Sequence, residues 1–308
     1  MISQEALLDV SLMLEIKNQI KKENVTMSTE KNLAKEIVSL NVAAWKWRLS
    51  DEPYYTRLTR ICNLIKRNTW HPFLIALQEV ILGDKYIALL QEELPDYEII
   101  TPKSYDASKN RRSAVCCTLV NKRDLISYSH NTLDGVEHGS GRYVYLTITS
   151  NHGCYRVLNV HVPQVAAFHD NAPTVYIESR YSLKAAFEST IQQEANTFHK
   201  DPDVKFIVVG DLNATPDSDF VKNLAYSPKH PAIIKEPLVD VISKDNISSP
   251  TWVNEQLGCA NRIDYLLYSL GTWTTCSLCR TELIDEPIKC RISDHAILRG
   301  RFFPTLND

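Results

Sequence analysis

A short apolar run over residues 205–209 is the feature that most constrains how this chain folds. The run is rich in β-branched residues and does not alternate between apolar and polar positions, which indicates a strand buried on both faces. It breaks at Gly210 and continues into Asp211, Leu212 and Asn213. Because successive side chains of an extended chain point to opposite faces, we expect Asp211 and Asn213 on one side and Leu212 in the core. Taken alone, the stretch fits an ordinary turn equally well.

Polar residues follow other expected strands in the same manner. Short apolar runs predict strands over residues 37–40, 73–77, 97–100, 114–120, 143–149, 156–160, 262–267 and 296–303. The acids, amides and histidines at the ends of such runs are Asn41, Glu79, Asn159, His161, Asp211, Asn213, Asp264, Asp294 and His295. Each one alone is explained by a turn or a cap. Buried strands do not ordinarily end in so many acids and amides unless a cation neutralises them, so together these residues indicate a site.

The expected helices alternate with these strands. Apolar residues recur at helical spacing between residues 58 and 65, 86 and 94, and 176 and 198. Strands outnumber helices, which favours two packed sheets covered by helices. Residues 1–35 predict a separate, amphipathic N-terminal helical extension that packs on the body or, as the less favoured alternative, binds a partner. Residues 36–308 contain neither a linker nor a repeat and predict one catalytic domain.

The composition is that of an ordinary globular protein, with 44% hydrophobic and 23% charged residues in a chain of 308. The formal net charge of -3 excludes a global basic field, so binding to nucleic acid requires a local basic patch. No apolar run reaches the length of a transmembrane helix, and the first residues lack the cationic start of a signal peptide. The sequence leaves the oligomeric state open.

The eight cysteines predict neither a disulfide framework nor structural zinc. Cys116 and Cys117 are adjacent within an apolar run, where free buried thiols are expected. Cys276 and Cys279 form a C-x-x-C pair and Cys290 follows, but no fourth ligand stands at the spacing of a zinc ribbon. We therefore expect packing residues and a reducing, cytoplasmic setting.

The donor types at the strand ends restrict the chemistry. Carboxylates and amide oxygens, without clustered cysteines or histidines, suit a hard cation such as Mg²⁺ or Mn²⁺ and not zinc. The sequence has no Gly-rich phosphate loop of the G-x-x-x-x-G-K-S/T type, which argues against nucleoside triphosphatase chemistry. Hydrolysis of a phosphate ester remains. In that reaction a metal polarises the phosphoryl oxygen, a carboxylate holds the water and a histidine shares the growing charge.

Six motifs, in their order and at their separations, resemble the endonuclease/exonuclease/phosphatase superfamily. They are Leu40-Asn41, Leu77-Gln78-Glu79-Val80, Leu158-Asn159-Val160-His161, Gly210-Asp211-Leu212-Asn213, Arg262-Ile263-Asp264 and Ser293-Asp294-His295. The resemblance spans roughly residues 36–303. It implies an α/β fold of the DNase I type, a four-layered sandwich in which two mainly antiparallel sheets are flanked by helices. It also implies a metal-dependent phosphoric ester hydrolase with its site at one end of the two sheets.

The resemblance implies a metal site and a water-activating acid. Glu79 resembles the main metal carboxylate, with Asn41 and Asp294 as ligands of the metal or of its water. Asp211 resembles the acid that orients or deprotonates the attacking water, and Asn213 the amide beside the phosphate.

The resemblance also implies roles for two histidines. His295 resembles the catalytic histidine and Asp240 the acid that orients it. Whether His295 serves as a base or as a positive clamp depends on its protonation state. His161 stands at the position of a phosphate-contacting residue, and Asp264 is expected to brace the site.

Three further residues are predicted to contact the substrate. Arg112 resembles a family arginine that precedes a small residue and a strand, and its charge suits a polyanion. Asn159 shares its motif with His161. Trp252 is expected in the wall of the cleft or in the core, with base stacking as the alternative.

The predicted function is that of a Mg²⁺-dependent or Mn²⁺-dependent phosphodiesterase, a nuclease that acts on DNA or RNA through in-line attack of water. Two alternatives stay open. One is a phosphoesterase for a small-molecule, lipid or inositol phosphate, and the other is a catalytically inactive binding module. The loops between the motifs carry no signature that decides among these substrates.

Overall fold

The structure of the chain is a computed structural model that describes residues 35–44, 52–69, 71–103, 105–106, 114–136, 141–164, 174–198, 203–226, 238–240, 250–254, 259–269, 273–280 and 293–304. Except for Lys35, the predicted N-terminal extension lies outside the described residues, as does Arg112.

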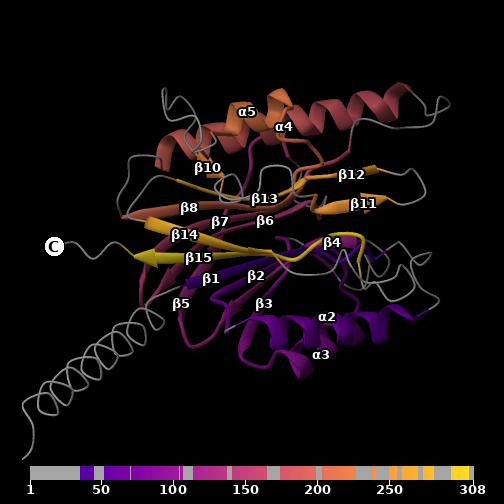
Figure 1. Cartoon of the computed structure of the whole chain (residues 1–308), viewed down its shortest axis with the longest axis vertical. Helices are drawn as coiled ribbons and strands as arrows, with labels where there is room; N and C mark the ends of the chain where they lie inside the picture. Colours follow the sequence, from indigo (N-terminus) through magenta and orange to yellow (C-terminus); the bar gives the residue numbers. More distant parts are fainter. Residues whose placement is uncertain are drawn as a thin grey trace, which may run out of the picture.

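Two β-sheets form the middle of the molecule (Figure 1). The first sheet runs in the order β14 (Trp273–Arg280), β15 (Leu298–Pro304), β1 (Lys35–Asn41), β2 (Leu74–Ile81), β4 (Ala114–Asn121) and β3 (Tyr97–Ile100). The second sheet runs in the order β5 (Leu125–His130), β6 (Tyr143–Ser150), β7 (Gly153–His161), β8 (Val204–Asp211), β13 (Asp264–Ser269), β10 (Leu238–Asp240) and β9 (Ala225–Tyr226). Strands β11 (Trp252–Asn254) and β12 (Cys259–Asn261) form a separate pair.

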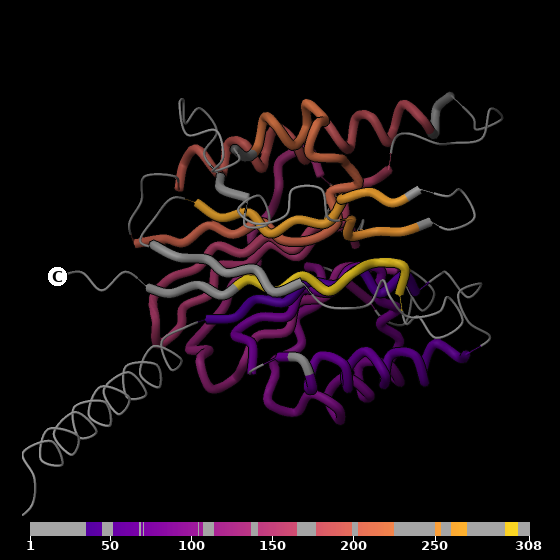
Figure 2. The backbone as a smooth tube through the Cα atoms, viewed as in Figure 1, coloured from indigo at the N-terminus to yellow at the C-terminus, as the bar shows by residue number. Residues whose placement is uncertain are grey.

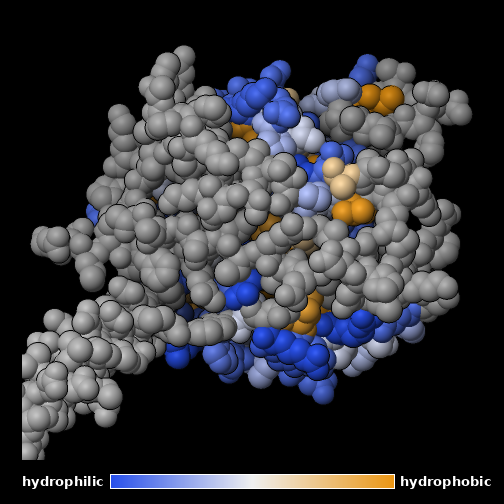
Figure 3. Space-filling view, in the orientation of Figure 1, coloured by the Kyte–Doolittle hydropathy of each residue, from blue (hydrophilic) through white to orange (hydrophobic). Residues whose placement is uncertain are grey.

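Helices cover the outer face of each sheet, which gives four layers. Helices α2 (Tyr54–Asn68) and α3 (Asp84–Glu93) lie on the first sheet, and α4 (Thr174–Phe198) and α5 (Asp219–Leu224) lie on the second (Figure 1). Hydrophilic residues gather over these outer helices (Figure 3). Among the described strands most pairs are antiparallel, and β1 with β2, β7 with β8 and β9 with β10 are parallel. The predicted four-layered sandwich is therefore confirmed.

Apolar side chains form three clusters, one between each two adjacent layers. Leu58 and Ile61 of α2 belong to the cluster under the first sheet. Val157 and Ile207 belong to the cluster between the sheets, and Phe187 of α4 to the cluster on the second sheet. Because β7 and β8 are covered on both faces, they read as continuous apolar runs, which is why the sequence predicted them as buried strands. These clusters hold the strand ends in fixed positions.

The observed elements differ from the predicted ones at strand ends and by strands that were not predicted, among them β9, β11, β12 and β14. Strand β8 continues through Gly210 to Asp211, and β2 continues past Glu79 to Ile81. Strand β5 was not predicted. It lies at the edge of the second sheet and most of its residues are exposed, so it has no apolar run. The predicted hairpin of β6 and β7, with its turn at Asn151, is confirmed.

Strands from the two ends of the described chain lie side by side. Strand β1 pairs with β15 on one edge and with β2 on the other. Figure 2 shows the indigo tube of β1 next to the yellow tube that leads into β15. The turn after β1 and the segment before β15 therefore meet at the same end of the first sheet. Among the described residues, no helix is long and apolar enough to cross a membrane.

Candidate active site

A cavity of about 360 Å³ opens where strands of both sheets end. Strand register brings these ends together, since His161 and Asp264 both stand opposite Asp211 on the two sides of β8. The lining residues include six of the predicted site residues, which are Glu79, His161, Asp211, Asn213, Trp252 and His295. They also include Arg142 and Arg180, which the sequence did not single out.

Glu79 reaches the cavity because β2 bulges at that point. The pairing register of β2 with β4 shifts between Leu77 and Val80, and Glu79 has a φ of 54°. Such a conformation is uncommon for a residue with a side chain and is held by its surroundings. Val42 N–H donates to Gln78 O at 2.9 Å and Ala44 N–H to Glu79 O at 3.3 Å, so the turn after β1 fixes the bulge.

Asp211 is almost completely buried, at 1% exposure. It follows Gly210, whose φ is 135° and where a Cβ would lie 2.1 Å from Val160 O, so only glycine fits. The Asp211 carboxylate accepts hydrogen bonds from Asn213 N at 2.8 Å and from Asn41 Nδ2 at 3.0 Å. Burial and then the charge of Asp264 raise the pKa of Asp211 above its usual range. A carboxyl with these surroundings is suited to hold or exchange a proton.

His295 forms a buried pair with Asp264, not with Asp240 as the sequence predicted. His295 Nδ1 lies 2.9 and 3.1 Å from the two carboxylate oxygens of Asp264. A ring nitrogen has room for one such carboxylate, and Asp240, on β10, stands opposite Leu267, three positions further along β13. Burial acts to lower the pKa of His295, but the charges of Asp264, Asp294 and Asp211 raise it to about 10. The pairing leaves Nε2 of His295 facing Asp211, at 4.0 Å.

His161 connects the two predicted acids. Its Nε2 lies 3.5 Å from Glu79 Oε1 and 3.8 Å from Asp211 Oδ2. Arg142 Nη1 lies 3.0 Å from Nδ1 of the same ring. Burial, followed by the charge of Arg142, holds the pKa of His161 well below its usual range. Arg142 precedes β6, and the pairing of β6 with β7 places it beside His161. No local sequence motif indicates this position.

Asp294 and Trp252 form one wall of the site. Trp252 Nε1 donates to Asp294 Oδ2 at 2.7 Å, and Asp294 Oδ1 lies 3.8 Å from His295 Nε2. Trp252 also forms a backbone bridge with His295. The tryptophan is therefore in the wall of the cavity, where it orients a carboxylate.

Asn159 is not at the substrate surface, which corrects its predicted role. The side chain has no exposed area and lies between the sheets. Its Nδ2 donates to Leu77 O at 3.2 Å and to Cys117 O at 2.9 Å, and its Oδ1 accepts from Gln78 Nε2 at 2.8 Å. Buried amides need such partners, so Asn159 joins the two sheets behind the site.

Asn41 presents its amide nitrogen to the acids. Nδ2 lies 3.3 Å from Glu79 Oε1 and 3.0 Å from Asp211 Oδ2, while Oδ1 accepts from Ala43 N at 2.9 Å. In this arrangement Asn41 holds the two carboxylates together as a donor. The sequence predicted Asn41 as a ligand of the metal or of its water, and a direct metal bond through Oδ1 requires the opposite orientation of the amide.

The donor set fits a hard divalent cation. Carboxylates of Glu79, Asp211, Asp264 and Asp294 meet at this end of the sheets, and ligand atoms of Asp211, Asp264 and His295 all lie within 4.8 Å of one another. Several buried carboxylates repel one another unless a positive charge lies among them. Oxygen donors of this kind are those that Mg²⁺ and Mn²⁺ take.

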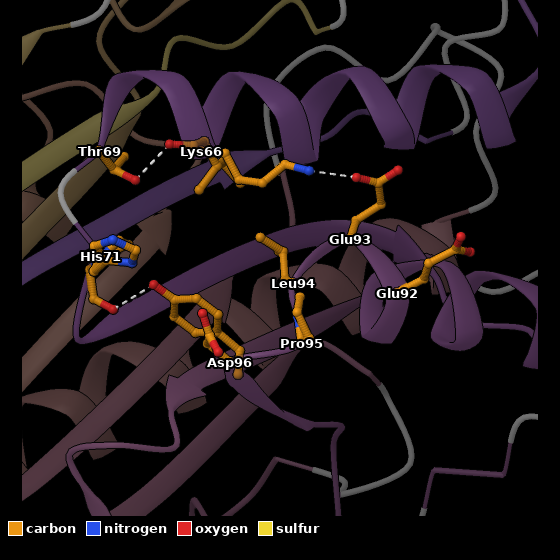
Figure 4. Close-up of a pocket in the computed structure, with 11 residues that line it drawn as sticks. Lys66, Thr69, His71, Glu92, Glu93, Leu94, Pro95 and Asp96 are labelled. Carbon is orange, nitrogen blue, oxygen red and sulfur yellow. Dashed lines mark hydrogen bonds and ion pairs between the residues drawn. The ribbon is translucent and has the colours of Figure 1, made fainter.

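A larger cavity, of about 470 Å³, lies at the carboxyl ends of α2 and α3 (Figure 4). Lys66 Nζ pairs there with Glu93 at 2.6 Å, and Tyr97 O–H donates to Pro72 O at 2.8 Å. Strand β2 begins beside this cavity and ends near Glu79, so roughly 20 Å of strand separates it from the predicted residues. It contains none of them.

The chain matches the Endonuclease/Exonuclease/phosphatase family over residues 40–295. It resembles the solved structure of TDP2 from C. elegans at 17% identity, covering 88% of this chain and 76% of that one, with a TM-score of 0.61. It resembles D. rerio TDP2 complexed with single strand DNA product at 16% identity, covering 87% and 98%, with a TM-score of 0.58. It resembles the 3′ phosphatase NExo from Neisseria bound to product DNA hairpin at 18% identity, covering 87% of this chain and 99% of that one, with a TM-score of 0.57. No match was found among curated proteins. The family match over residues 40–295 covers most of the chain. The chain therefore belongs to the Endonuclease/Exonuclease/phosphatase family and is a phosphoric ester hydrolase of that type.

Proposed function

We propose that this hydrolase is a divalent-metal phosphodiesterase that cleaves nucleic acid by in-line attack of water, with Mg²⁺ or Mn²⁺ as its cation. One observation carries the proposal. The carboxylates of Glu79 and Asp211 line the same small cavity as two histidines and two arginines, and the buried carboxylates of Asp264 and Asp294 lie within 4 Å of one of those histidines, His295. A phosphodiester is an anion, so it can approach these carboxylates only when a cation is bound among them.

Glu79 and Asp294 are the proposed metal carboxylates, and Asn41 keeps Glu79 in place. The bound cation would polarise the phosphoryl oxygen and stabilise the leaving group. Asp211 orients the attacking water and takes up its proton. Its carboxylate is fixed for this task by the hydrogen bonds from Asn213 N and Asn41 Nδ2.

The histidines and arginines are proposed to hold the phosphate. His295, aligned by Asp264 through Nδ1, presents Nε2 to a phosphate oxygen. His161 and Arg142 lie side by side on the opposite flank of Asp211, where they contact the non-bridging oxygens. Asn213 donates Nδ2 to Val162 O, which holds its side chain at the edge of the cavity. Charge that develops on the phosphate is thus met by donors that are already in position.

Nucleic acid is the proposed substrate class. Arg142 and Arg180 supply positive charge in the cavity, and Trp252 supplies an aromatic wall next to them. Two of the proteins of similar fold were solved with a DNA product bound. The proposed compartment is the reducing cytoplasm, because Cys116 and Cys117 are free and buried although they are adjacent.

A turnover panel tests the proposal. The full chain in Mg²⁺ is incubated with single-stranded DNA, an abasic duplex, RNA, and lipid and inositol phosphodiesters. We expect cleavage of at least one polynucleotide by the wild type and by Asp217→Asn, which alters an exposed acid in the next turn. Asp211→Asn should cleave the same substrate at least about 100-fold more slowly than the wild type. Turnover of only the lipid or inositol esters would replace nucleic acid as the substrate, and no turnover at all would overturn the proposal.

A further inference from the structure

The first turn of α2 lies against the ends of β1 and β2, and a buried arginine of this turn donates hydrogen bonds to the segment after β1. Arg57 is 3% exposed. Its Nη2 donates to Ala43 O and to Ala44 O, both at 3.1 Å. Among the described residues, no carboxylate forms an ion pair with it within 4.0 Å, and Nη1 has no hydrogen-bond partner. Burying a charge in this way costs stability, so the arginine is poorly explained as a packing residue.

The segment that Arg57 holds is strained and carries the site. Ala43 has a φ of 46°, a conformation that needs support from its surroundings. Ala43 N–H donates to Asn41 Oδ1 at 2.9 Å, which sets the orientation of the Asn41 amide. Ala44 N–H donates to Glu79 O at 3.3 Å. By holding the carbonyl groups of Ala43 and Ala44, Arg57 fixes two things. It fixes the Asn41 amide, which donates to both Glu79 and Asp211, and it fixes the backbone of Glu79, the proposed metal carboxylate.

A second residue of the same turn ties the bulge from its other side. Tyr54 OH accepts a hydrogen bond from Ile81 N at 3.2 Å, two residues after Glu79. The Arg57 guanidinium lies 5.4 Å from the centre of the Tyr54 ring, so the two side chains support each other. Its charge also interacts with the carboxylates of Asp294 and Glu79.

We propose that Arg57 is a positioning residue for the metal site, which it serves through the turn at residues 41–44. The inference rests on the proposed function in that it takes Glu79 and Asp294 as metal carboxylates. When the guanidinium is removed, the turn relaxes, Asn41 and Glu79 move apart, and the cation binds less tightly. Changes behind metal ligands typically cost about 10- to 100-fold in metal affinity, and a loss of this size is expected for Arg57→Met.

The first test measures Mn²⁺ affinity of the full chain by electron paramagnetic resonance, without any substrate. Arg57→Met is compared with Arg60→Met, one turn away on α2, where the arginine is part-exposed and pairs with Glu52. We expect at least a tenfold rise in the Kd for Mn²⁺ in the first variant and less than a twofold change in the second. Equal affinities in the two variants, or a wild type that binds no Mn²⁺, would overturn the inference.

The second test separates positioning from a general loss of structure. At low Mg²⁺ the Arg57→Met enzyme should have a reduced kcat with an unchanged KM for substrate, and excess Mg²⁺ should restore kcat. A defect that excess Mg²⁺ does not relieve would speak for misfolding and against the inference.

Should Arg57→Met fail to fold, Tyr54→Phe removes only the hydroxyl that holds Ile81 and should raise the Kd for Mn²⁺ by about threefold; no rise would overturn the inference. If Mn²⁺ affinity changes as expected while the wild type cleaves no polynucleotide, the substrate proposal fails and the inference about Arg57 stands.

Discussion

Two of the cavities among the described residues can be compared, and the smaller one holds the more deeply buried charges. The larger one, beside Lys66 and Glu93, has an ion pair whose side chains are 42% and 21% exposed. In the smaller one, His295 and Asp211 have side chains that are 5% and 2% exposed. Exposed pairs are screened by water and contribute little, whereas buried charges change each other's proton affinity. The comparison teaches that buried charge, and not volume, distinguishes the end of the sheets where we propose that the chemistry takes place.

Removal of the divalent cation should have the largest effect at the smaller cavity. Dialysis against EDTA is expected to abolish phosphodiester hydrolysis, and added Mg²⁺ or Mn²⁺ should restore it, because the carboxylates otherwise repel the anionic substrate. A fluorescent oligonucleotide reports the rates. Full activity in EDTA would falsify the metal-dependent mechanism.

Loss of the water-orienting acid should come next. Asp211→Asn keeps the shape of the side chain and removes its ability to take a proton, so kcat should fall by about 10²- to 10⁴-fold. The circular dichroism spectrum should stay that of the wild type. Retention of more than a tenth of the wild-type kcat would mean that Asp211 is not the acid that activates water.

The two acids proposed for His295 can be distinguished directly. Asp264→Asn should lower kcat by about 100-fold, since it removes the partner that aligns the ring. Asp240→Asn should leave kcat within about twofold, because Asp264 already occupies Nδ1. Single-turnover rates of both variants test these two expectations. A larger loss of rate in Asp240→Asn than in Asp264→Asn would show that Asp240 is the acid that aligns His295.

The amide between the sheets should matter for stability more than for chemistry. Asn159→Ala leaves the carbonyl groups of Leu77 and Cys117 without their donor, so the free energy of unfolding should fall by about 1 to 3 kcal/mol. Urea unfolding measures the change. An unaltered unfolding midpoint would show that these carbonyl groups find other partners.

The smallest effect is expected at the larger cavity. Lys66→Ala removes one partner of an exposed ion pair, so the free energy of unfolding should change by less than about 1 kcal/mol. Phosphodiester hydrolysis should not change. Should this variant lose activity, the contrast between the two cavities would no longer hold.

Sequence predicted most of the fold because its strands are buried on both faces and read as apolar runs. The runs before Asn41, Glu79 and Asp211 were therefore found, and the residues that follow them do meet in one cavity. Asp240 and Asn159 were placed wrongly for a common reason. Their positions depend on strand register and on contacts across the sheets, and a single sequence contains no measure of either. Arg57, Arg142 and Arg180 were missed because nothing in their neighbourhood along the chain differs from an ordinary charged helix or strand end.

The pairing of β1 with β15 makes the site depend on two segments that are far apart in the sequence. Ser293 Oγ donates to Asn41 O at 2.6 Å across 252 positions of sequence. Until the ribosome has released that distant segment, β1 is an edge strand and Asn41 and Glu79 lack Asp294 and His295. A nascent chain that has emerged only as far as β13 therefore holds part of the site and is expected to be inert toward phosphodiesters. Assembly of the site thus waits for synthesis of the segment that carries Asp294 and His295.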